Sequence, residues 1–411
     1  MTARTIIFDL DGTLLDTLED LAAAVDHALA LRGLPPHTLE EYRTMVGHGV
    51  RNLVRQALGP AHDDAVVDAA LADFKAYYTA HIDERTRPYP GIPELLRTLH
   101  ARGFALAIAS NKFQEGTERL AARFFPGIPF AVILGNRPGC PLKPDPGIIG
   151  EVLRRTGSAP ADAVMVGDSR TDMLTAANGG IRGIAVNWGY RTLAPSDAYT
   201  LVDSVAGLER ALLTERHPFQ PFLPEDARIL FLGSFPPGAH RWSMPFYYPN
   251  FQNDFWRILG LIFFQDPAHF ILPGQKRFDE GAIRAFCRAR GLAFYDTATE
   301  VVRRKDNASD AFLEVITPTD IPALLARIPA CRDIVVTGEK AARTLAATLG
   351  CPPPPVGGSV EVTLGSGHVG ITSRALTLWR MPSTSRAYPL PLEKKAKEYR
   401  KVLEGRIYPG S

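Results

Sequence analysis

A short apolar run near the N-terminus, Ile6–Phe8, ends on the carboxylates Asp9 and Asp11, after which Gly12 and Thr13 turn the chain. The β-favouring side chains of this run predict a buried strand. Open α/β sheets bind their ligands at the carboxyl ends of their strands, which is where this acidic pair stands. One carboxylate of such a pair can attack a substrate while the other moves protons. Ordinary turn aspartates explain the pair equally well, so its role depends on the rest of the chain.

The length of 411 residues predicts two or three domains. A hydrophobic content of 45% and a charged content of 22% are typical of a soluble globular protein. The sequence contains no run of about 18 apolar residues and no basic-then-apolar leader, so we expect a cytoplasmic protein without membrane contact. The four cysteines lie far apart and predict neither a zinc site nor a disulfide framework.

Strand and helix patterns alternate in the first half of the chain. The short apolar segments that predict strands are Arg4–Phe8, Phe104–Ala109, Ala163–Val166 and Gly183–Val186. Between residues 16 and 87 only amphipathic helical stretches occur, at Leu18–Leu31, Leu39–Leu58 and Asp64–His81. We therefore predict a Rossmann-like parallel sheet formed by residues 1–15 and 88–212, with a helical cap inserted at 16–87.

A proline-rich segment, His217–Pro224, follows this half and predicts a linker at residues 213–225. A second α/β pattern then occupies residues 226–411. Its predicted strands are Ile229–Leu232, Leu292–Tyr295, Asp333–Val336 and Ala375–Trp379, and Leu392–Leu403 predicts a basic closing helix. Basic residues outnumber acidic ones in this half only, which favours a polyanion as its partner, although a solvated basic helix alone would produce the same excess.

Further polar groups follow the later strands of the first half. Ser110 and Asn111 follow one strand, Lys143 stands in the run LKPDPG, and Asp168 and Asp172 follow another strand. A hydroxyl at a strand end can bond a phosphate oxygen, and a lysine can neutralise a phosphate or an attacking carboxylate. Converging carboxylates suit Mg²⁺, which prefers oxygen ligands. Each piece is a weak signal alone, but their order at successive strand ends indicates one site.

These segments resemble the motifs of haloacid dehalogenase-like hydrolases, specifically the phosphoglycolate phosphatase branch. The matching segments are DLDGTLLDT at Asp9–Thr17, SNK at Ser110–Lys112, KP at Lys143–Pro144 and GDSRTD at Gly167–Asp172. The resemblance implies that Asp9 attacks phosphorus to form an aspartyl-phosphate. Asp11 would protonate the leaving alkoxide and then activate water, and an acid at this position favours a phosphatase over a dehalogenase.

The same resemblance implies the remaining site groups of the first half. Ser110 and Lys143 would hold the phosphoryl group, and Thr13 and Asn111 would be further substrate contacts. The implied cofactor is Mg²⁺, and its ligands would be Asp9, the backbone carbonyl of Asp11, Asp168 and, in support, Asp172. A dianionic phosphate requires such positive charge to approach an anionic nucleophile.

The cap segment Val46–Leu58 also resembles this branch, and substrate choice would belong to the cap, which would close over the site and exclude water. The candidates for contact with the leaving group are Gly47, His48, Gly49 and Arg51, although His48 fits a surface loop almost as well. We expect a small phosphate ester as substrate, with 2-phosphoglycolate first. Pyrophosphate, sugar phosphates and nucleotides remain open, because relatives of this branch accept them.

In the second half, GSFPP, YYPNFQNDFW and MPSTSRAYP resemble segments of the uracil-DNA glycosylase superfamily, nearest its hypoxanthine and mismatch glycosylases. The likeness implies a three-layer α/β/α domain in which these segments meet around a flipped base. By resemblance, Phe235 and Tyr248 border or stack on the base, and Asn253 polarises it or positions water. Phe235 stands where the mismatch-type motif carries asparagine, so a catalytically inactive DNA-binding module remains an alternative, as does a locally aromatic core.

DNA is thus the expected partner of the second half. The loop Pro382–Ser385, with Ser383 and Ser385, would contact the DNA backbone or wedge the duplex, while Arg386 and Lys394–Lys397 would add phosphate contacts. The sequence as a whole predicts a Mg²⁺-dependent phosphatase fused to a glycosylase-like domain. It does not determine the oligomeric state.

Overall fold

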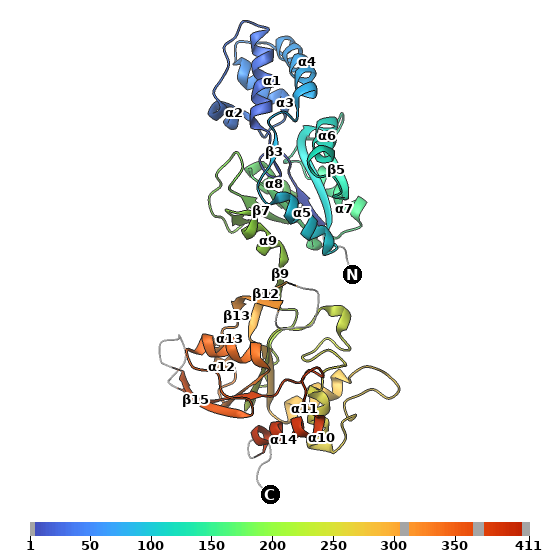
Figure 1. Ribbon diagram of the computed structural model, residues 1–411, viewed down its shortest axis with the longest axis vertical. Coiled ribbons are helices and arrows are strands. Elements are labelled where there is room, and N and C mark those ends of the chain that lie inside the picture. The colour runs from blue at the N-terminus through green and yellow to red at the C-terminus, as the bar shows by residue number, and fades with distance from the viewer. Residues whose placement is uncertain (1–4, 305–311, 365–373, 405–411) are drawn as a thin grey trace. The chain divides into compact units, whose positions relative to one another are not determined.

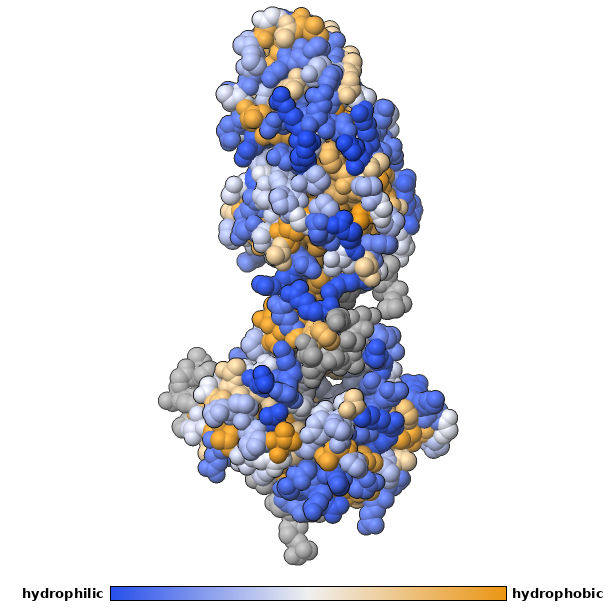
Figure 2. Space-filling model, viewed as in Figure 1, coloured by the Kyte–Doolittle hydropathy of each residue, from blue (hydrophilic) through white to orange (hydrophobic). Residues whose placement is uncertain are grey.

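The computed structural model describes residues 5–304, 312–364 and 374–404 (Figure 1). The chain divides into two compact units, Met1–Leu212 and Leu213–Ser411. Arg4, which the sequence assigns to the first strand, lies outside the described residues. None of the described helices is both long enough and apolar enough to span a membrane. On the visible face of each unit, scattered apolar residues interrupt a mostly hydrophilic surface (Figure 2), which is usual for a protein surface in water.

Six parallel strands form the main sheet of the first unit, in the order β5-β4-β1-β6-β7-β8. Their bounds are β1 (Thr5–Phe8), β4 (Ala105–Phe113), β5 (Phe130–Asn136), β6 (Ala163–Gly167), β7 (Arg182–Val186) and β8 (Thr200–Val202). The elements that flank the sheet are α5 (Ile92–Ala101), α6 (Gln114–Phe124), α7 (Gly147–Thr156), η1 (Pro160–Asp162), α8 (Arg170–Asn178) and α9 (Val205–Leu213). All of β1 is buried, because successive side chains point to opposite faces and helices cover parallel sheets on both faces. The parallel α/β sheet expected from the sequence is confirmed.

A helical insert separates β1 from α5. It consists of α1 (Leu18–Ala30), α2 (Leu39–Met45), α3 (Val50–Leu58) and α4 (Asp64–His81), and a two-residue strand pair, β2 (Leu15–Asp16) with β3 (Arg87–Pro88), closes its base. The prediction of a single helix over Leu39–Leu58 is wrong, because this segment forms two helices, α2 and α3. Gly47 and Gly49 lie between the two helices with φ of 119° and 83°, and such backbone cannot belong to a right-handed helix.

The second unit contains a five-stranded sheet in the order β11-β10-β14-β16-β15, parallel except for the last strand. Its strands are β10 (Ile229–Gly233), β11 (Leu292–Asp296), β14 (Asp333–Thr337), β15 (Gly358–Leu364) and β16 (Arg374–Met381). The helical elements are η2 (Ala239–Arg241), α10 (Phe255–Phe264), α11 (Glu280–Ala289), α12 (Ile321–Ala326), α13 (Glu339–Leu349) and α14 (Leu392–Leu403). Figure 1 shows α12 and α13 on one side of this sheet and α10, α11 and α14 on the other.

The segment 213–225, for which the sequence predicts a linker, is instead part of the second unit. β9 (Thr214–Arg216) pairs with β12 (Ala298–Arg303), which in turn pairs with β13 (Leu313–Pro318). Phe222 exchanges backbone hydrogen bonds with Phe294 and is buried in the core of this unit. The prolines of the segment prevent a helix, but they permit extended backbone whose apolar side chains still need burial.

Candidate active site

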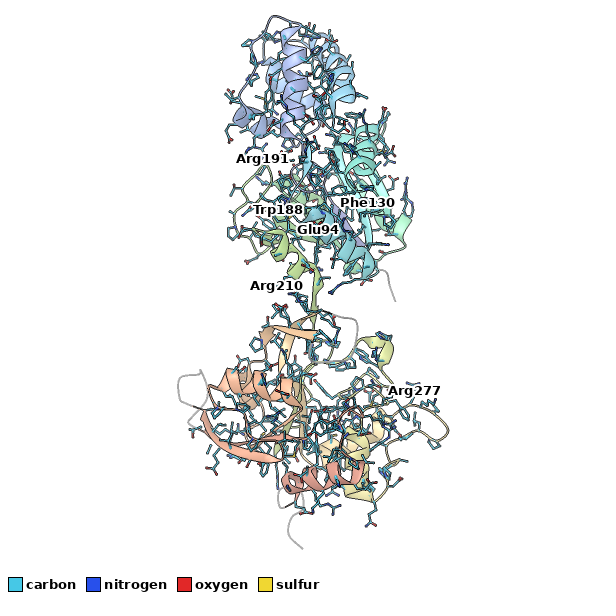
Figure 3. All side chains as sticks on the ribbon, viewed as in Figure 1. Glu94, Phe130, Trp188, Arg191, Arg210 and Arg277 are labelled. Carbon is cyan, nitrogen blue, oxygen red and sulfur yellow. The ribbon has the colours of Figure 1, made fainter. Side chains whose placement is uncertain are left out.

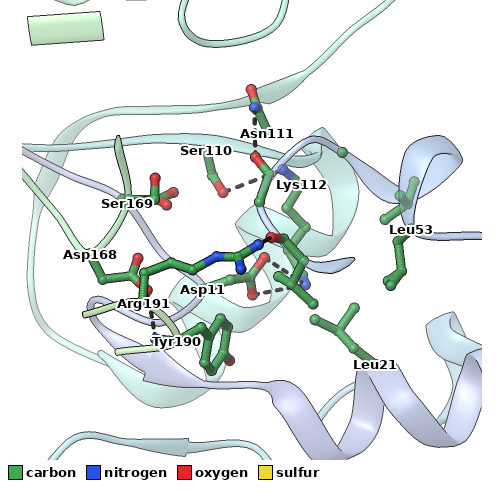
Figure 4. Close-up of a pocket in the computed structure, with 15 residues that line it drawn as sticks. Asp11, Leu21, Leu53, Ser110, Asn111, Lys112, Asp168, Ser169, Tyr190 and Arg191 are labelled. Atoms are coloured by element: carbon green, nitrogen blue, oxygen red, sulfur yellow. Dashed lines mark hydrogen bonds and ion pairs between the residues drawn. The ribbon is translucent and has the colours of Figure 1, made fainter. Parts of the chain in front are cut away.

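The carboxyl ends of β1, β4 and β6 meet at one edge of the sheet and form a cavity beneath the helical insert (Figure 4). Asp9, Asp11, Ser110, Asn111 and Asp168 line this cavity from the sheet. Three parallel neighbours necessarily bring their carboxyl ends to the same edge, which is why residues distant in sequence converge here. The structure therefore brings together most of the site residues that the sequence predicts for the first half.

Lys143 is the cation at the centre of this cluster. Its Nζ lies 2.9 Å from Oδ1 of Asp9 and 2.6 Å from Oδ1 of Asp172, and its side chain is 2% exposed. Although burial alone would lower the pKa of Lys143, the carboxylates of Asp172 and Asp9 hold it above its usual range. Lys143 therefore carries a permanent positive charge directly beside the Asp9 carboxylate.

Asp9, Asp168 and Asp172 each place a carboxylate oxygen within 4.8 Å of the others. Burial, followed by repulsion from Asp172 and Asp9, raises the pKa of Asp168 to about 8. Burial also raises the pKa of Asp9 to about 6, against the opposing effect of Lys143. Once ionised, three clustered carboxylates with one lysine carry excess negative charge, so this donor set fits a hard divalent cation such as Mg²⁺.

Glycines allow the backbone to approach Asp168 closely. A Cβ on Gly12, whose φ is +82°, would lie 2.3 Å from Oδ2 of Asp168, and a Cβ on Gly189 would lie 2.4 Å from the same atom. Thr13 is buried and its Oγ1 donates to Oδ1 of Asp168 at 3.3 Å, while the Tyr190 amide donates to Oδ2 at 2.7 Å. Thr13 therefore helps to hold Asp168, and its contact with substrate stays a prediction.

Asp11 occupies a separate position, toward the insert. Its Oδ1 accepts from the Thr17 hydroxyl at 2.6 Å and from Lys112 Nζ at 3.1 Å. Lys112 also donates to the Tyr78 hydroxyl of α4 at 2.7 Å, and its side chain is buried. The sequence places Lys112 in the SNK segment without assigning it a role, and only the fold shows that it joins Asp11 to the insert.

Ser110 and Asn111 lie in the last part of β4, where the register with β5 shifts between Ala109 and Phe113. The buried Ser110 hydroxyl accepts from the backbone amide of Lys112 at 3.3 Å. The Asn111 amide group donates to the backbone oxygens of Gly47 and Lys143, and its Oδ1 accepts from the Lys143 amide. Asn111 therefore joins the insert to the loop that carries Lys143, in addition to lining the cavity.

The helical insert lines the cavity with apolar side chains and with the backbone of two glycines. Gly47 and Gly49 line the cavity, together with the apolar side chains of Leu21, Val46, Val50 and Leu53, and their contact with the leaving group stays a prediction. His48 is exposed and does not line it. The predicted substrate contact of Arg51 is contradicted, because its guanidinium pairs with Asp64 and Asp68 of α4 on the outer surface.

Arg191 is a cavity residue that the sequence does not reveal. It follows Tyr190, and its Nη2 donates to the backbone oxygens of Thr44 and Val46 in the insert (Figure 4; Figure 3 also labels Arg191). Within the described ranges, no carboxylate is paired with Arg191. A single arginine in a loop has no motif around it, so only its position in the fold identifies it.

A second cavity, of about 290 Å³, lies in the second unit. It stands at the carboxyl ends of β10, β11 and β14. The residues that line it include Ser234, Phe235, Tyr248, Asn253, Asp296, Thr337, Ser383, Thr384, Ser385 and Arg386. The three segments that the sequence singles out in this half therefore surround one cavity.

The polar and aromatic groups of this second cavity have defined partners. The Tyr248 ring stacks on Phe255 with centroids 3.9 Å apart, and its hydroxyl bonds Thr337 Oγ1 at 2.9 Å. Asn253 Oδ1 accepts from the Phe255 amide at 2.9 Å. His217 Nε2 lies 2.9 Å from Oδ2 of Asp296 on the cavity wall, a pair that the predicted linker gave no reason to expect.

The predicted phosphate contacts near the C-terminus are only partly accessible. Lys395 is buried, and its Nζ bonds Asp254 Oδ2 at 2.9 Å and the Ser385 backbone oxygen at 2.8 Å. The prediction that Lys395 contacts DNA is therefore wrong, because the ammonium neutralises Asp254 inside the unit. Lys394 and Lys397 are exposed, and Arg386 lies 3.2 Å from Asp254 Oδ1.

Comparison with known proteins concerns the first half of the chain. The family profile described as haloacid dehalogenase-like hydrolase matches residues 6–186. The chain is similar to the protein named phosphoglycolate phosphatase of Pseudomonas putida, with 39% identity over 201 residues that cover 47% of this chain and 73% of the relative. It is also similar to phosphoglycolate phosphatase 1 of Pseudomonas aeruginosa, with 38% identity over 232 residues that cover 54% of this chain and 84% of the relative.

One solved structure similar to this chain is that of CbbY from Rhodobacter sphaeroides in complex with phosphate. It is 27% identical, with a TM-score of 0.44, and the alignment covers 51% of this chain and 100% of that one. The family match coincides with the strands and loops that form the first cavity. Through its first unit, the chain belongs to the haloacid dehalogenase-like hydrolase family.

Proposed function

We propose that the first unit hydrolyses a small phosphate monoester, 2-phosphoglycolate by preference, through an aspartyl-phosphate. The observation that carries this proposal is the buried cluster in which Lys143 lies 2.9 Å from Asp9 among three converging carboxylates. An anionic nucleophile beside a fixed cation and a cation-binding donor set is the arrangement that phosphoryl transfer requires.

In the first step, a carboxylate oxygen of Asp9 attacks phosphorus while the bond from phosphorus to the ester oxygen breaks. Asp11 gives its proton to that departing oxygen. In the second step, water attacks phosphorus, Asp11 takes its proton, and the bond to Asp9 breaks to release phosphate. Lys143 and Ser110 hold the phosphoryl oxygens throughout.

The residues that would hold Mg²⁺ are Asp9, Asp168, Asp172 and the backbone carbonyl of Asp11. A bound Mg²⁺ would supply positive charge that offsets the repulsion between the phosphate and Asp9. Thr13 and the Tyr190 amide keep the Asp168 carboxylate in place for this role.

The preference for 2-phosphoglycolate is supported by the remaining cation of the cavity. Lys143 pairs with Asp9 and Asp172 and is assigned to the phosphoryl group, and Lys112 pairs with Asp11. Among the residues that the structure describes, Arg191 bonds only backbone oxygens. The Nε and Nη1 groups of its planar guanidinium can receive a carboxylate at the far end of the leaving group. The names of two similar proteins, phosphoglycolate phosphatase and phosphoglycolate phosphatase 1, support the choice of this substrate.

Phosphate release from 2-phosphoglycolate, pyrophosphate, a sugar phosphate and a nucleotide, each with Mg²⁺, tests the proposal. We expect 2-phosphoglycolate to give the highest kcat/KM and Asp9→Asn to abolish turnover of every ester. Activity that survives in Asp9→Asn would contradict the assignment of Asp9 as the nucleophile. A higher kcat/KM for another ester would keep the mechanism and replace the substrate.

We propose, as a second function, that the second unit excises a damaged or mismatched base from DNA. The observation that favours it is that Phe235, Tyr248, Asn253 and the 383–386 loop surround one cavity. An aromatic wall and an amide suit a base turned out of a duplex. Duplexes bearing uracil, hypoxanthine or a mismatch should yield alkali-labile sites, and binding without such sites would favour the inactive DNA-binding module.

A further inference from the structure

A groove of basic residues lies beside the cavity of the second unit. We define this basic groove by six of its lining residues, His240, Arg241, Trp242, Phe251, Lys276 and Arg277. Its three cations, Arg241, Lys276 and Arg277, are exposed, as is His240, whose Nε2 accepts from Arg241 Nε at 3.2 Å. Figure 3 shows Arg277 on the segment between α10 and α11. The groove has a volume of about 540 Å³.

The charge of this groove is one-sided. In the part of the chain that the structure describes, no acidic side chain lines the groove. None of its basic side chains takes part in a described ion pair, in contrast to Arg51, Arg386 and Lys395 elsewhere in the chain. Exposed cations without acidic partners form a positive potential that attracts a polyanion.

The basic groove and the cavity form one continuous surface. Arg241, Asn250 and Gln252 line both of them. A ligand that extends along the groove would therefore reach the rim of the cavity that contains Asn253. A small anion would need one or two of the cations of the groove, whereas a chain of phosphates can engage Arg241, Lys276 and Arg277 together.

The groove also offers aromatic surface. Trp242 and Phe251 are partly exposed and lie among the basic residues. Alternation of cations with aromatic faces is how proteins hold single strands of nucleic acid, because phosphates pair with the cations while bases stack on the rings.

We infer that the basic groove binds the phosphate backbone of a DNA strand and leads one of its nucleotides to the neighbouring cavity. The choice of DNA rests on the proposed excision function, while the binding itself does not depend on catalysis. Phosphate contacts thus come from residues 240–241 and 276–277, in place of the buried Lys395.

The test uses the full-length protein and a fluorescently labelled single-stranded DNA oligonucleotide of mixed sequence, over a range of salt concentrations. The groove variant combines Arg241→Gln, Lys276→Gln and Arg277→Gln. The matched control combines Arg327→Gln, Arg343→Gln and Lys401→Gln, three exposed cations of the second unit that line neither the groove nor the cavity. Thermal unfolding of both variants verifies that they fold.

We expect the groove variant to bind the DNA oligonucleotide roughly tenfold to a hundredfold more weakly than the wild type. The slope of log Kd against the logarithm of the salt concentration should be smaller by about 2. The control should retain the affinity of the wild type. Equal losses in both variants, no loss in either, or no binding by the wild type would overturn the inference. Tighter binding of an RNA strand of the same sequence would overturn the assignment to DNA.

The outcome for the groove is separate from that for excision. Wild-type protein that binds DNA through the groove but creates no abasic sites would refute the excision function and support the groove. If the groove variant excises bases and binds DNA with unchanged affinity, the excision function is supported and the groove is refuted.

Discussion

The Nζ atom of Lys112 lies 3.1 Å from Oδ1 of Asp11 and 2.7 Å from the hydroxyl of Tyr78, so one buried ammonium joins a carboxylate of the sheet edge to the helical insert. The contact between Lys112 and Asp11 lies within the sheet edge itself, and Tyr78 is its neighbour from the insert. The geometry makes Lys112 a positioning residue for the proton transfer proposed for Asp11.

Replacing Lys112 by Gln should therefore lower kcat for 2-phosphoglycolate by roughly tenfold to a hundredfold, within the range that general acids contribute. The loss should be much smaller for p-nitrophenyl phosphate, whose leaving group needs no proton. Steady-state kinetics with the two esters measures this difference. Tyr78→Phe serves as a control that keeps the Lys112–Asp11 contact, and equal losses on both esters would contradict the positioning role.

Arg191→Gln should raise KM for 2-phosphoglycolate, because the guanidinium that would receive the substrate carboxylate is lost. A charge-assisted hydrogen bond contributes about 1.5–3 kcal/mol, which predicts a fall in kcat/KM of roughly tenfold or more. The comparison substrate is 2-hydroxyethyl phosphate, which lacks the carboxylate and should lose far less. Arg43→Gln, an exposed arginine that does not line the cavity, provides the control. Preserved selectivity in Arg191→Gln would show that this residue only holds the insert.

The buried carboxylates predict how stability depends on pH and Mg²⁺. In metal-free protein the pKa of Asp168 is raised from 3.8 to about 8, and that of Asp9 to about 6. The folded state then holds protons that the unfolded state has lost, so the free energy of unfolding should fall as the pH rises from about 4 to about 8.

Added Mg²⁺ binds the deprotonated carboxylates, and its stabilising effect should grow over the same pH interval. Thermal unfolding scans of the chain with and without Mg²⁺, at a series of pH values, measure both trends. Asp168→Asn should remove most of the Mg²⁺ effect. A Mg²⁺ effect that is constant from pH 5 to pH 8 would refute the assignment of these residues as its ligands.

Lys395→Met should destabilise the second unit by about 1.5–3 kcal/mol, because Asp254 loses its buried lysine partner and keeps only the half-exposed Arg386. The neighbouring substitution Lys394→Met removes the same charge from an exposed position and should change stability by less than about 0.5 kcal/mol. Urea denaturation of both variants checks this. Similar small effects in the two variants would mean that the buried pair contributes little.

Several features could be read from the sequence because they depend on local patterns. The apolar run of β1 with Asp9 at its end, and the polar residues that follow β4 and β6, predicted both a parallel sheet and a site at its edge. α4 begins and ends where its amphipathic pattern predicts, at Asp64 and His81. Parallel strands share one carboxyl edge, so local signals in the right order were enough to predict the first cavity.

Pairing between distant residues could not be read in this way. The sequence shows that Lys112, Arg191 and Lys395 are basic, but a charge pattern does not reveal which carboxylate or carbonyl each one meets. Lys395 and its partner Asp254 are 141 residues apart, and the contact exists only because α14 packs against α10. The same holds for Arg51, whose partners Asp64 and Asp68 lie on α4 and are brought to it by the packing of α4 against α3.

The sequence by itself determined the chemical groups at the first site, the order in which they occur and the family to which they point, since each is a matter of residue type at a strand end. Only the tertiary structure decided which cations remain available to a ligand. That outcome depends on burial and on partners brought together by folding, and so it separated Lys395, buried against Asp254, from the exposed Arg241, Lys276 and Arg277.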